Sequence, residues 1–200
     1  MTTERVIEIP WCLAQLPQSG RILDVGSCEA VYLGVIQQVD RELHCLDPRD
    51  CRAGIPPGAV FHHQSLIGNT LRRSFYDAVL VISVLEHIGL PCYEQEPFPR
   101  GDALALAEVW ELLKPGAPAL VTVPAGQSKL VSWYRQYSPA DLHRQFADWR
   151  HEVRYWGFDG AIYKPIPEEA VEDYDYRDRH DAGAGAGAMA AIAAWRAWRS

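Results

Sequence analysis

Short apolar runs, each closed by a turn signal, alternate with segments of helical periodicity along residues 20–124. Three of these runs, at 21–26 (RILDVG), 42–47 (ELHCLD) and 59–64 (AVFHHQ), are typical of short strands. The strongest run covers 76–83 (YDAVLVIS), where nearly continuous β-branched and leucine residues indicate a central strand that is buried on both faces. A further strand is predicted over 117–124 (APALVTVP).

Helical segments are predicted between these strands. Apolar residues, among them Val31 and Val35, recur at helical spacing and predict a helix over 29–38, directly after the first strand. Asp102 is placed to cap a second helix over 103–113. Strand and helix therefore alternate, which predicts an α/β fold with a mostly parallel sheet and helices on both faces.

The last third of the chain is less regular. Ser138, followed by a proline and an acid, is placed to cap a helix that runs to about Trp149, and 151–158 alternates like a strand. The Ala/Gly repeat at 182–188 predicts a flexible link. Residues 188–198 are ambiguous, because alanine favours a helix whereas an apolar run this late in an α/β chain also suits a final strand.

Composition narrows the class of protein. The chain has 200 residues, of which 48% are hydrophobic and 22% are charged, and its formal net charge is −7. These values predict one globular domain over residues 1–200 and argue against nucleic acid, which binds mainly through Lys and Arg. No apolar stretch is long enough to span a membrane, and the acid at Glu4 is unlike a signal peptide, so we expect a cytoplasmic protein. A small-molecule partner is therefore expected, while the oligomeric state is left open.

The cysteines and histidines do not form a recognisable metal or disulfide pattern. The chain has five cysteines and no C-x-x-C pair, so we expect reduced and mostly buried thiols. His62 and His63 are adjacent on a predicted strand and therefore face opposite sides, which excludes their binding one ion together. No metal site is predicted. Arg49 is interpreted as a surface charge.

The loop after the first predicted strand is the usual floor of a ligand site in an open α/β sheet. A dinucleotide fingerprint requires G-x-G-x-x-G, but after Gly26 the two later glycine positions hold Cys28 and Val31. An NAD-dependent oxidoreductase is therefore disfavoured. Asp47 ends the second strand about twenty residues further on, where a carboxylate can accept both hydroxyls of a ribose. Its alternative role is that of a turn aspartate.

Four segments in order resemble the class I S-adenosylmethionine-dependent methyltransferases, in particular their small type-11-like members. They are LDVGSCEA, CLDP, YDAVLVISVLEHIG and ALAEVWELLKPGAPALVTVP. The resemblance covers residues 20–124 well and 125–200 loosely. The first motif departs from the family pattern, which is glycine-rich where this chain reads Gly26-Ser27-Cys28-Glu29-Ala30.

The resemblance implies a cofactor, S-adenosyl-L-methionine, and the residues that hold it. Asp24, Gly26 and Ser27 would hold its amino-acid end and Asp47 its ribose. Ser65 would replace the acid that often faces the adenine amino group, and Ser83 would lie beneath the methionyl portion.

The family fold is Rossmann-like, a seven-stranded sheet in the order 3-2-1-4-5-7-6. This order makes 188–198 the final antiparallel strand. The resemblance also assigns cofactor binding to about 20–124 and acceptor binding to loops and C-terminal strands in 125–200.

Methyl transfer is an in-line displacement that needs good alignment and, for a hydroxyl or protonated amine, a base. His87 lies just beyond the fourth strand and is a candidate base, with Glu86 as a candidate to orient it or to contact the acceptor. The alternative is that His87 packs beneath the loop, because the same L-E-H-I-G string recurs in family members with very different acceptors.

Two aromatic loops could shape the acceptor site. Residues 90–102 contain Tyr93 and Phe98, and 127–137 contain Trp133, Tyr134 and Tyr137. Such side chains can exclude water and face a sulfonium, although aromatic packing onto the core is an equal alternative. Only about twenty residues precede the first predicted strand, so no sizeable N-terminal cap over the site is expected.

The sequence therefore predicts methyl transfer to an oxygen or nitrogen of a small metabolite. The alternative is a catalytically degenerate Rossmann-like module for nucleotide binding or interaction.

Overall fold

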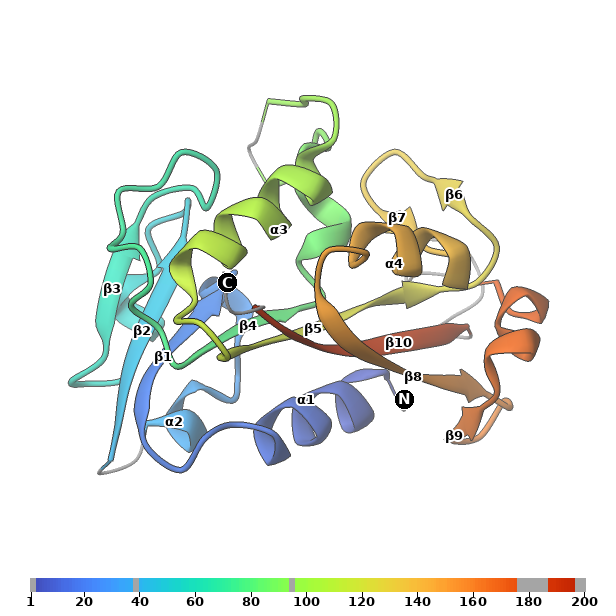
Figure 1. Ribbon diagram of the computed structural model, residues 1–200, viewed down its shortest axis with the longest axis horizontal. Helices are drawn as coiled ribbons and strands as arrows, with labels where there is room; N and C mark the ends of the chain where they lie inside the picture. Colours follow the sequence, from blue (N-terminus) through green and yellow to red (C-terminus); the bar gives the residue numbers. More distant parts are fainter. Residues whose placement is uncertain (1–2, 38–39, 94–95, 176–186, 197–200) are drawn as a thin grey trace.

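An eight-stranded sheet carries the fold in the computed structural model, which describes residues 3–37, 40–93, 96–175 and 187–196. The strand order is β3-β2-β1-β4-β5-β10-β8-β9 (Figure 1). Pairing is parallel from β3 to β5, whereas β10, β8 and β9 each run antiparallel to their neighbours. The strands of this sheet are β1 (Gly20–Val25), β2 (Arg41–Asp47), β3 (Val60–His63), β4 (Ala78–Ile82), β5 (Pro118–Ala125), β8 (Arg150–Phe158), β9 (Tyr163–Ile166) and β10 (Ala188–Trp195).

This order confirms the predicted topology. In chain order, β10 and β8 take the places of the seventh and sixth strands, and β10 lies antiparallel between β5 and β8. Strand β9 adds an eighth, outer strand that the prediction did not include. Ala188 is already in β10 rather than in a link, and 182–186 of the predicted link lie outside the described residues.

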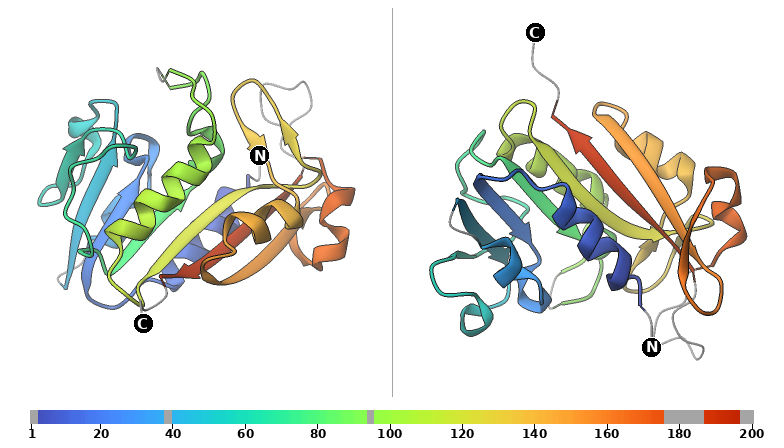
Figure 2. Two further views of the ribbon diagram at one scale, coloured as in Figure 1. Left: turned by 45° about the horizontal axis from the view of Figure 1, so that its top comes forward. Right: turned by 90° about the horizontal axis from the view of Figure 1, so that it is seen from below.

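Helices cover both faces of the sheet. Figures 1 and 2 show α1 and α2 on one face and α3 and α4 on the other. No helix in the described ranges has both the length and the apolar character that crossing a bilayer requires. The helices are α1 (Arg5–Ala14), α2 (Leu33–Ile36), α3 (Gly101–Leu112) and α4 (Pro139–Gln145), with 3₁₀ turns η1 (Ser27–Glu29), η2 (Arg52–Gly54), η3 (Leu85–His87) and η4 (Glu168–Asp173) and a small hairpin of β6 (Lys129–Leu130) and β7 (Arg135–Gln136).

Strand β4 is central and every one of its residues is buried, as its sequence predicts. Successive side chains point to opposite faces. Val79 and Val81 pack in the cluster that includes Leu106 of α3, whereas Leu80 packs in the cluster that includes Cys12 of α1. The apolar run of β4 therefore supplies a core to both layers at once.

The predicted helix over 29–38 is reduced to the four residues of α2. The reason is that the apolar periodicity does not form a buried face: Val31 is 89% exposed and Val35 is 57% exposed, while Leu33 and Ile36 are buried. The preceding residues form the turn η1 instead.

Two other helix boundaries differ from prediction. Asp102 does not cap α3, because the helix begins at Gly101, two residues earlier than predicted, and follows Arg100 in a left-handed conformation. Asp102 is instead buried and accepts hydrogen bonds from the Tyr137 hydroxyl and the Gln145 side chain. Helix α4 ends at Gln145, since the chain turns there and buries Phe146 and Trp149 in the core.

Helix α1 was not predicted. It packs on one face of the sheet (Figure 2), and the expectation that no sizeable N-terminal cap lies over the site stays a prediction. Pro10 lies inside this helix, where proline normally signals a break. The helix nevertheless buries Cys12 against the sheet and brings Glu8 into the interior.

Ser138 caps α4 as predicted. Its hydroxyl accepts a hydrogen bond from the Asp141 backbone N–H, and the Asp141 carboxylate accepts one from the Ser138 backbone N–H, which is a complete capping box. We expect Ser138→Ala to lower the free energy of unfolding by about 1 kcal/mol because it leaves this helix N–H without its partner. Urea denaturation measures the change, and Ser132→Ala, at an exposed loop serine, is the control. Equal losses in the two variants would contradict this role.

Candidate functional site

The candidate site lies at the edge of the sheet where β1, β2 and β4 end. These strands are parallel and adjacent, with Asp24 of β1 paired to Cys45 of β2 and to Leu80 of β4. Their carboxyl ends therefore meet at one edge, which is the usual ligand position in open α/β sheets. Five of the predicted site residues stand in or just after these ends: Asp24, Gly26, Ser27, Asp47 and Ser83.

Gly26 forms the tight turn after β1. Its φ of 79° is left-handed, and a Cβ added there would lie 2.5 Å from Cγ2 of Val84 in the loop after β4. Glycine is thus required both for the turn and for the close approach of two loops. The Ser27 hydroxyl donates to the Asp24 carbonyl over 2.9 Å and fixes the start of η1.

The Asp24 carboxyl group is fully buried. Its Oδ1 accepts a hydrogen bond of 2.7 Å from the Tyr32 hydroxyl, while Oδ2 is buried and has no hydrogen-bond partner among the described residues. Burial raises the pKa of Asp24 to about 7. A buried oxygen without a hydrogen-bond partner, such as Asp24 Oδ2, is suited to a ligand that brings its own N–H donors.

The Asp47 carboxylate is almost fully buried and accepts hydrogen bonds at both oxygens. Oδ1 accepts from the Arg49 backbone N–H over 2.9 Å and from Arg49 Nε over 3.2 Å. Oδ2 accepts from the Cys28 backbone N–H over 3.0 Å and from Arg49 Nη2 over 3.3 Å. Arg49 is therefore a component of the site, and its interpretation as a surface charge is wrong. Only the fold shows this, because the guanidinium turns back onto its own loop.

Cys28 and Cys51 form a disulfide with a Cα–Cα distance of 5.3 Å, which corrects the expectation of reduced thiols. The bond joins the loop after β1 to the loop after β2, and the parallel pairing of these strands brings the two cysteines together. Cysteine spacing alone contains no such signal. Cys12 and Cys45 are free and buried, as expected, and Cys92 is free and half-buried.

The sequence predicts no metal site. The ligand atoms of Cys28, Asp47 and Cys51 lie within 4.8 Å of one another, but both sulfur atoms are engaged in the disulfide.

A buried carboxyl group from α1 reaches the end of β4. The Ser83 hydroxyl donates to Glu8 Oε2 over 2.9 Å and the Thr122 hydroxyl donates to the same oxygen over 2.8 Å, while Arg5 pairs with Oε1 at 2.7 Å. Burial raises the pKa of Glu8. No pattern in the sequence marked Glu8, because the helix that carries it was not predicted.

Glu86 and His87 lie in η3, directly beyond β4. His87 Nδ1 is 2.7 Å from the Trp133 carbonyl, which can only accept, so this nitrogen carries the hydrogen. The imidazole stacks on the Trp133 ring at 5.0 Å, and its Nε2 lies 3.7 Å from Glu86 Oε1. Glu86 Oε2 is buried and has no hydrogen-bond partner among the described residues, and burial raises the pKa of Glu86 to about 8.

The structure does not gather all the predicted site residues. Tyr93 contacts both the His87 ring, at 5.2 Å, and the Arg49 guanidinium, at 4.9 Å. Tyr134 and Tyr137 are buried, and Ser65 is exposed at the end of β3, where its hydroxyl accepts from the Ile67 N–H.

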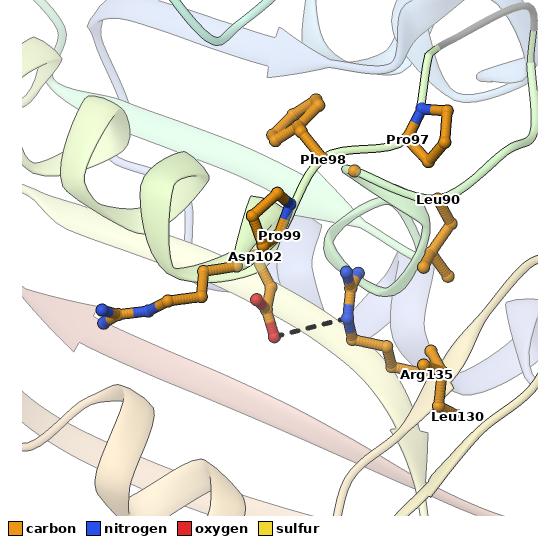
Figure 3. A pocket seen from close by; sticks show the side chains of 9 residues that line it. Leu90, Pro97, Phe98, Pro99, Asp102, Leu130 and Arg135 are labelled. Carbon is orange, nitrogen blue, oxygen red and sulfur yellow. Dashed lines mark ion pairs between the residues drawn. The ribbon is translucent and has the colours of Figure 1, made fainter.

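An open pocket of about 540 Å³ lies between the two loops predicted to shape the acceptor site (Figure 3). Phe98 contributes to its wall, and an ion pair at 3.8 Å joins Asp102 to Arg135 across it. Arg135 also donates to the Ile88 carbonyl over 2.8 Å, which connects the pocket to the end of η3. Its lining residues are Gly89, Leu90, Pro97, Phe98, Pro99, Arg100, Asp102, Leu130 and Arg135.

Neither a family model nor a curated protein matches the sequence. Solved structures do match. An S-adenosylmethionine-dependent methyltransferase from Methanosarcina mazei is 12% identical, with a TM-score of 0.64 over 94% of this chain and 98% of its own. The Burkholderia thailandensis 1,6-didemethyltoxoflavin-N1-methyltransferase, with 1,6-didemethyltoxoflavin and S-adenosylhomocysteine bound, is 13% identical, with a TM-score of 0.64 over 93% of this chain and 75% of its own.

The chain therefore has the class I S-adenosylmethionine-dependent methyltransferase fold, as predicted. The same fold can serve different reactions. The [4+2]-cyclase SpnF also matches, at 14% identity and a TM-score of 0.61, over 94% of this chain and 80% of its own. At these identities the likeness concerns the fold, and the function has to be argued from the site.

The raised pKa of Glu86 makes stability depend on pH. The folded protein keeps this proton up to about pH 8, whereas the unfolded chain releases it near the ordinary value of 4.5. The contribution of Glu86 to the free energy of unfolding is thus fully present below pH 4.5 and is lost as the pH rises through 8. We expect the wild type to lose on the order of a few kcal/mol of unfolding free energy between about pH 5 and 8 for this reason. Glu86→Gln stays neutral and should not show this loss.

Urea denaturation at several pH values measures this difference. Glu169→Gln, at an exposed glutamate, is the control. If the wild type and Glu86→Gln lose stability in parallel as the pH rises, Glu86 is not the group responsible.

Proposed function

We propose that the protein is an S-adenosylmethionine-dependent methyltransferase that transfers a methyl group to an oxygen or nitrogen of a small-molecule acceptor in the cytoplasm. The observation that carries the proposal is the fully buried Asp24 carboxyl group beside the Gly26 turn, with one oxygen that lacks a partner among the described residues. In this fold that position faces the ligand edge of the sheet.

The donor set is compatible with this cofactor. An ammonium group supplies the N–H donor that Asp24 Oδ2 is missing. In the proposal Asp24, Gly26 and Ser27 hold the amino-acid end, and Ser83 lies beneath the methionyl portion. Asp47 binds the ribose hydroxyls and Ser65 the adenine amino group. The bound cofactor supplies a methyl group activated by its sulfonium.

The residues of η3 would handle the acceptor proton. Because the Trp133 carbonyl holds the hydrogen on Nδ1, Nε2 is the accepting nitrogen of the neutral His87 ring. It can take a proton from an acceptor hydroxyl or amine as the new bond forms. Glu86 Oε1 lies 3.7 Å from Nε2 and, even in the neutral carboxyl group, can accept a hydrogen bond from the N–H of the resulting imidazolium.

The pocket between the two loops is the proposed acceptor site. Its wall combines apolar side chains, including Leu90, Phe98 and Leu130, with the Asp102–Arg135 ion pair. A small molecule with an apolar body and one polar edge fits this surface. Tyr93 and Trp133 flank His87 and would exclude water from the reacting groups, with Tyr134 and Tyr137 supporting these loops from within.

Binding of S-adenosylhomocysteine by the reduced protein tests the proposal first. We expect isothermal titration calorimetry to detect one-site binding, because Asp24 and Asp47 supply acceptors for both polar ends of the ligand. NAD, titrated in the same way, is the control and should not bind. If the reduced protein does not bind S-adenosylhomocysteine at millimolar concentration, the proposal is wrong.

The role of His87 is tested by turnover. We expect His87→Gln to lower methyl transfer by a factor on the order of 10² to 10⁴ and to leave S-adenosylhomocysteine affinity unchanged. Mass spectrometry of candidate acceptors measures transfer, and the variant should also lose the acid limb of the pH–rate profile. An unchanged rate would assign His87 to packing alone. Tight cofactor binding without turnover on any acceptor would favour a nucleotide-binding module.

A further inference from the structure

The Asp47 carboxylate has no hydrogen-bonding capacity left in this structure. An ionised carboxylate offers about four lone-pair positions, two on each oxygen. Backbone N–H groups of Cys28 and Arg49 take one on each oxygen, and the Arg49 guanidinium takes the other one on each. The guanidinium therefore occupies the two positions that a ribose would need for its two hydroxyls.

The Arg49 side chain is held in place from two further directions. Its Nη1 donates to Glu29 Oε1 over 2.9 Å, and its guanidinium lies 4.9 Å from the centre of the Tyr93 ring. The backbone carbonyl of Arg49 also lies 3.6 Å from Cys28 Sγ. Glu29 belongs to the loop after β1 and Arg49 to the loop after β2, so these contacts cross the same gap as the disulfide.

We propose that Arg49 and the Cys28–Cys51 disulfide form a redox-controlled latch that closes the ribose position on Asp47, and that reduction of the disulfide opens this position to an adenosine-containing ligand. The inference rests on the proposed function, because the latch regulates Asp47, the proposed ribose-binding residue. It also gives a role to Cys28, which stands where the family motif has a glycine.

The disulfide controls Arg49 because it fixes both ends of the contact. Cys51 follows Arg49 by two residues, and Cys28 directly precedes Glu29. Once the sulfur–sulfur bond is broken, the Cys28 N–H still donates to Asp47, but the Arg49 side chain is held to the loop after β1 only by its pair with Glu29, whose side chain is 65% exposed. Exposed pairs of this kind are weak. A ligand that brings two hydroxyl groups can then displace the guanidinium from Asp47.

The redox step needs a dithiol reductant as co-reactant. A thiolate of the reductant attacks one sulfur of the disulfide and releases the other as a thiolate. The second thiol of the reductant then resolves the mixed disulfide. The protein gains two thiols, taking up two electrons and two protons, and the reductant becomes a disulfide. Cys28 and Cys51 are half-buried and can be reached, whereas Cys12 and Cys45 are buried.

A disulfide placed at this position suits a switch in a reducing compartment. Disulfides in such compartments are usually transient and serve catalysis or redox sensing. The sulfur atoms also lie within 4.8 Å of an Asp47 oxygen, so breaking the disulfide changes the immediate surroundings of the proposed ribose-binding residue. A purely structural crosslink would make no difference to ligand affinity, which separates the two roles experimentally.

Calorimetric titration with S-adenosylhomocysteine tests the latch on the oxidised and the dithiol-reduced full chain, in buffer with a chelator that keeps metal from the released thiols. We expect reduction to tighten binding by about tenfold or more, because the ligand no longer has to displace a fixed guanidinium from both carboxylate oxygens. Mass spectrometry after alkylation should find three reactive cysteines in the oxidised denatured protein and five after reduction.

Two variants separate the parts of the latch. Arg49→Ala leaves the disulfide intact and should bring the oxidised protein close to the affinity of the reduced one. The Cys28→Ser/Cys51→Ser double variant should bind like the reduced protein and no longer respond to the dithiol. Arg52→Ala, at the neighbouring exposed arginine, and Cys92→Ser, at a free cysteine, are the matched controls and should behave like the wild type.

Equal affinity of the oxidised and reduced wild type overturns the latch while the proposed function stands, and so does tighter binding by the oxidised form. Five reactive cysteines before reduction overturn it as well. An Arg49→Ala variant that binds like the oxidised wild type shows that the guanidinium does not block the ligand. If no form binds, including reduced Arg49→Ala, the proposed function itself fails and the latch falls with it.

Discussion

The parallel pairing of β1 with β2 and β4 is the constraint on which the rest of the site depends. It places three strand ends at one edge of the sheet, so that loops far apart in sequence become neighbours. The Gly26 turn, which touches Val84, and the bond between Cys28 and Cys51 both follow from this adjacency. Central β4 anchors the arrangement, because its side chains are buried in both layers of the core.

Burial of acids is the second organising feature of this edge. Glu8, Asp24 and Glu86 are all withdrawn from water, and burial is the largest cause of the raised pKa of each. The interior therefore favours their protonated forms, and near neutral pH Glu86 is largely uncharged. Asp47 has different neighbours, since two backbone N–H groups and a guanidinium donate hydrogen bonds to it. The edge thus combines a carboxylate group surrounded by donors with buried carboxyl groups that can donate as well as accept.

Sequence reasoning predicted most of the sheet because its signals are local. The apolar run of β4 and the Ser138 capping box each depend on a few neighbouring residues, and both formed as expected. The antiparallel placement of β10 came from the family resemblance, since its alanines alone favour a helix. Helix α1 was not predicted because Pro10, which normally signals a helix break, lies inside it. The length of α2 was predicted too long because Val31 and Val35 face solvent.

The candidate site was predictable only in part, for a different reason. Asp24, Gly26 and Asp47 stand in strand ends and turns that the pattern marks. The partners of these residues come from distant segments, such as Tyr32 for Asp24 and the Ser83–Glu8 contact across 75 positions. Such pairings depend on tertiary structure and leave no local signal.

The link between Cys28 and Cys51 also acts on the unfolded chain. It closes a loop with a sequence separation of 23 residues, and a loop of this size removes enough chain entropy to raise stability by roughly 3 kcal/mol. Reduction therefore has opposite effects on two properties: it releases the ribose acid and weakens the fold around it. A ligand that binds the reduced form restores part of that loss by mass action. The ligand-ready protein would then depend on its ligand for resistance to unfolding and proteolysis.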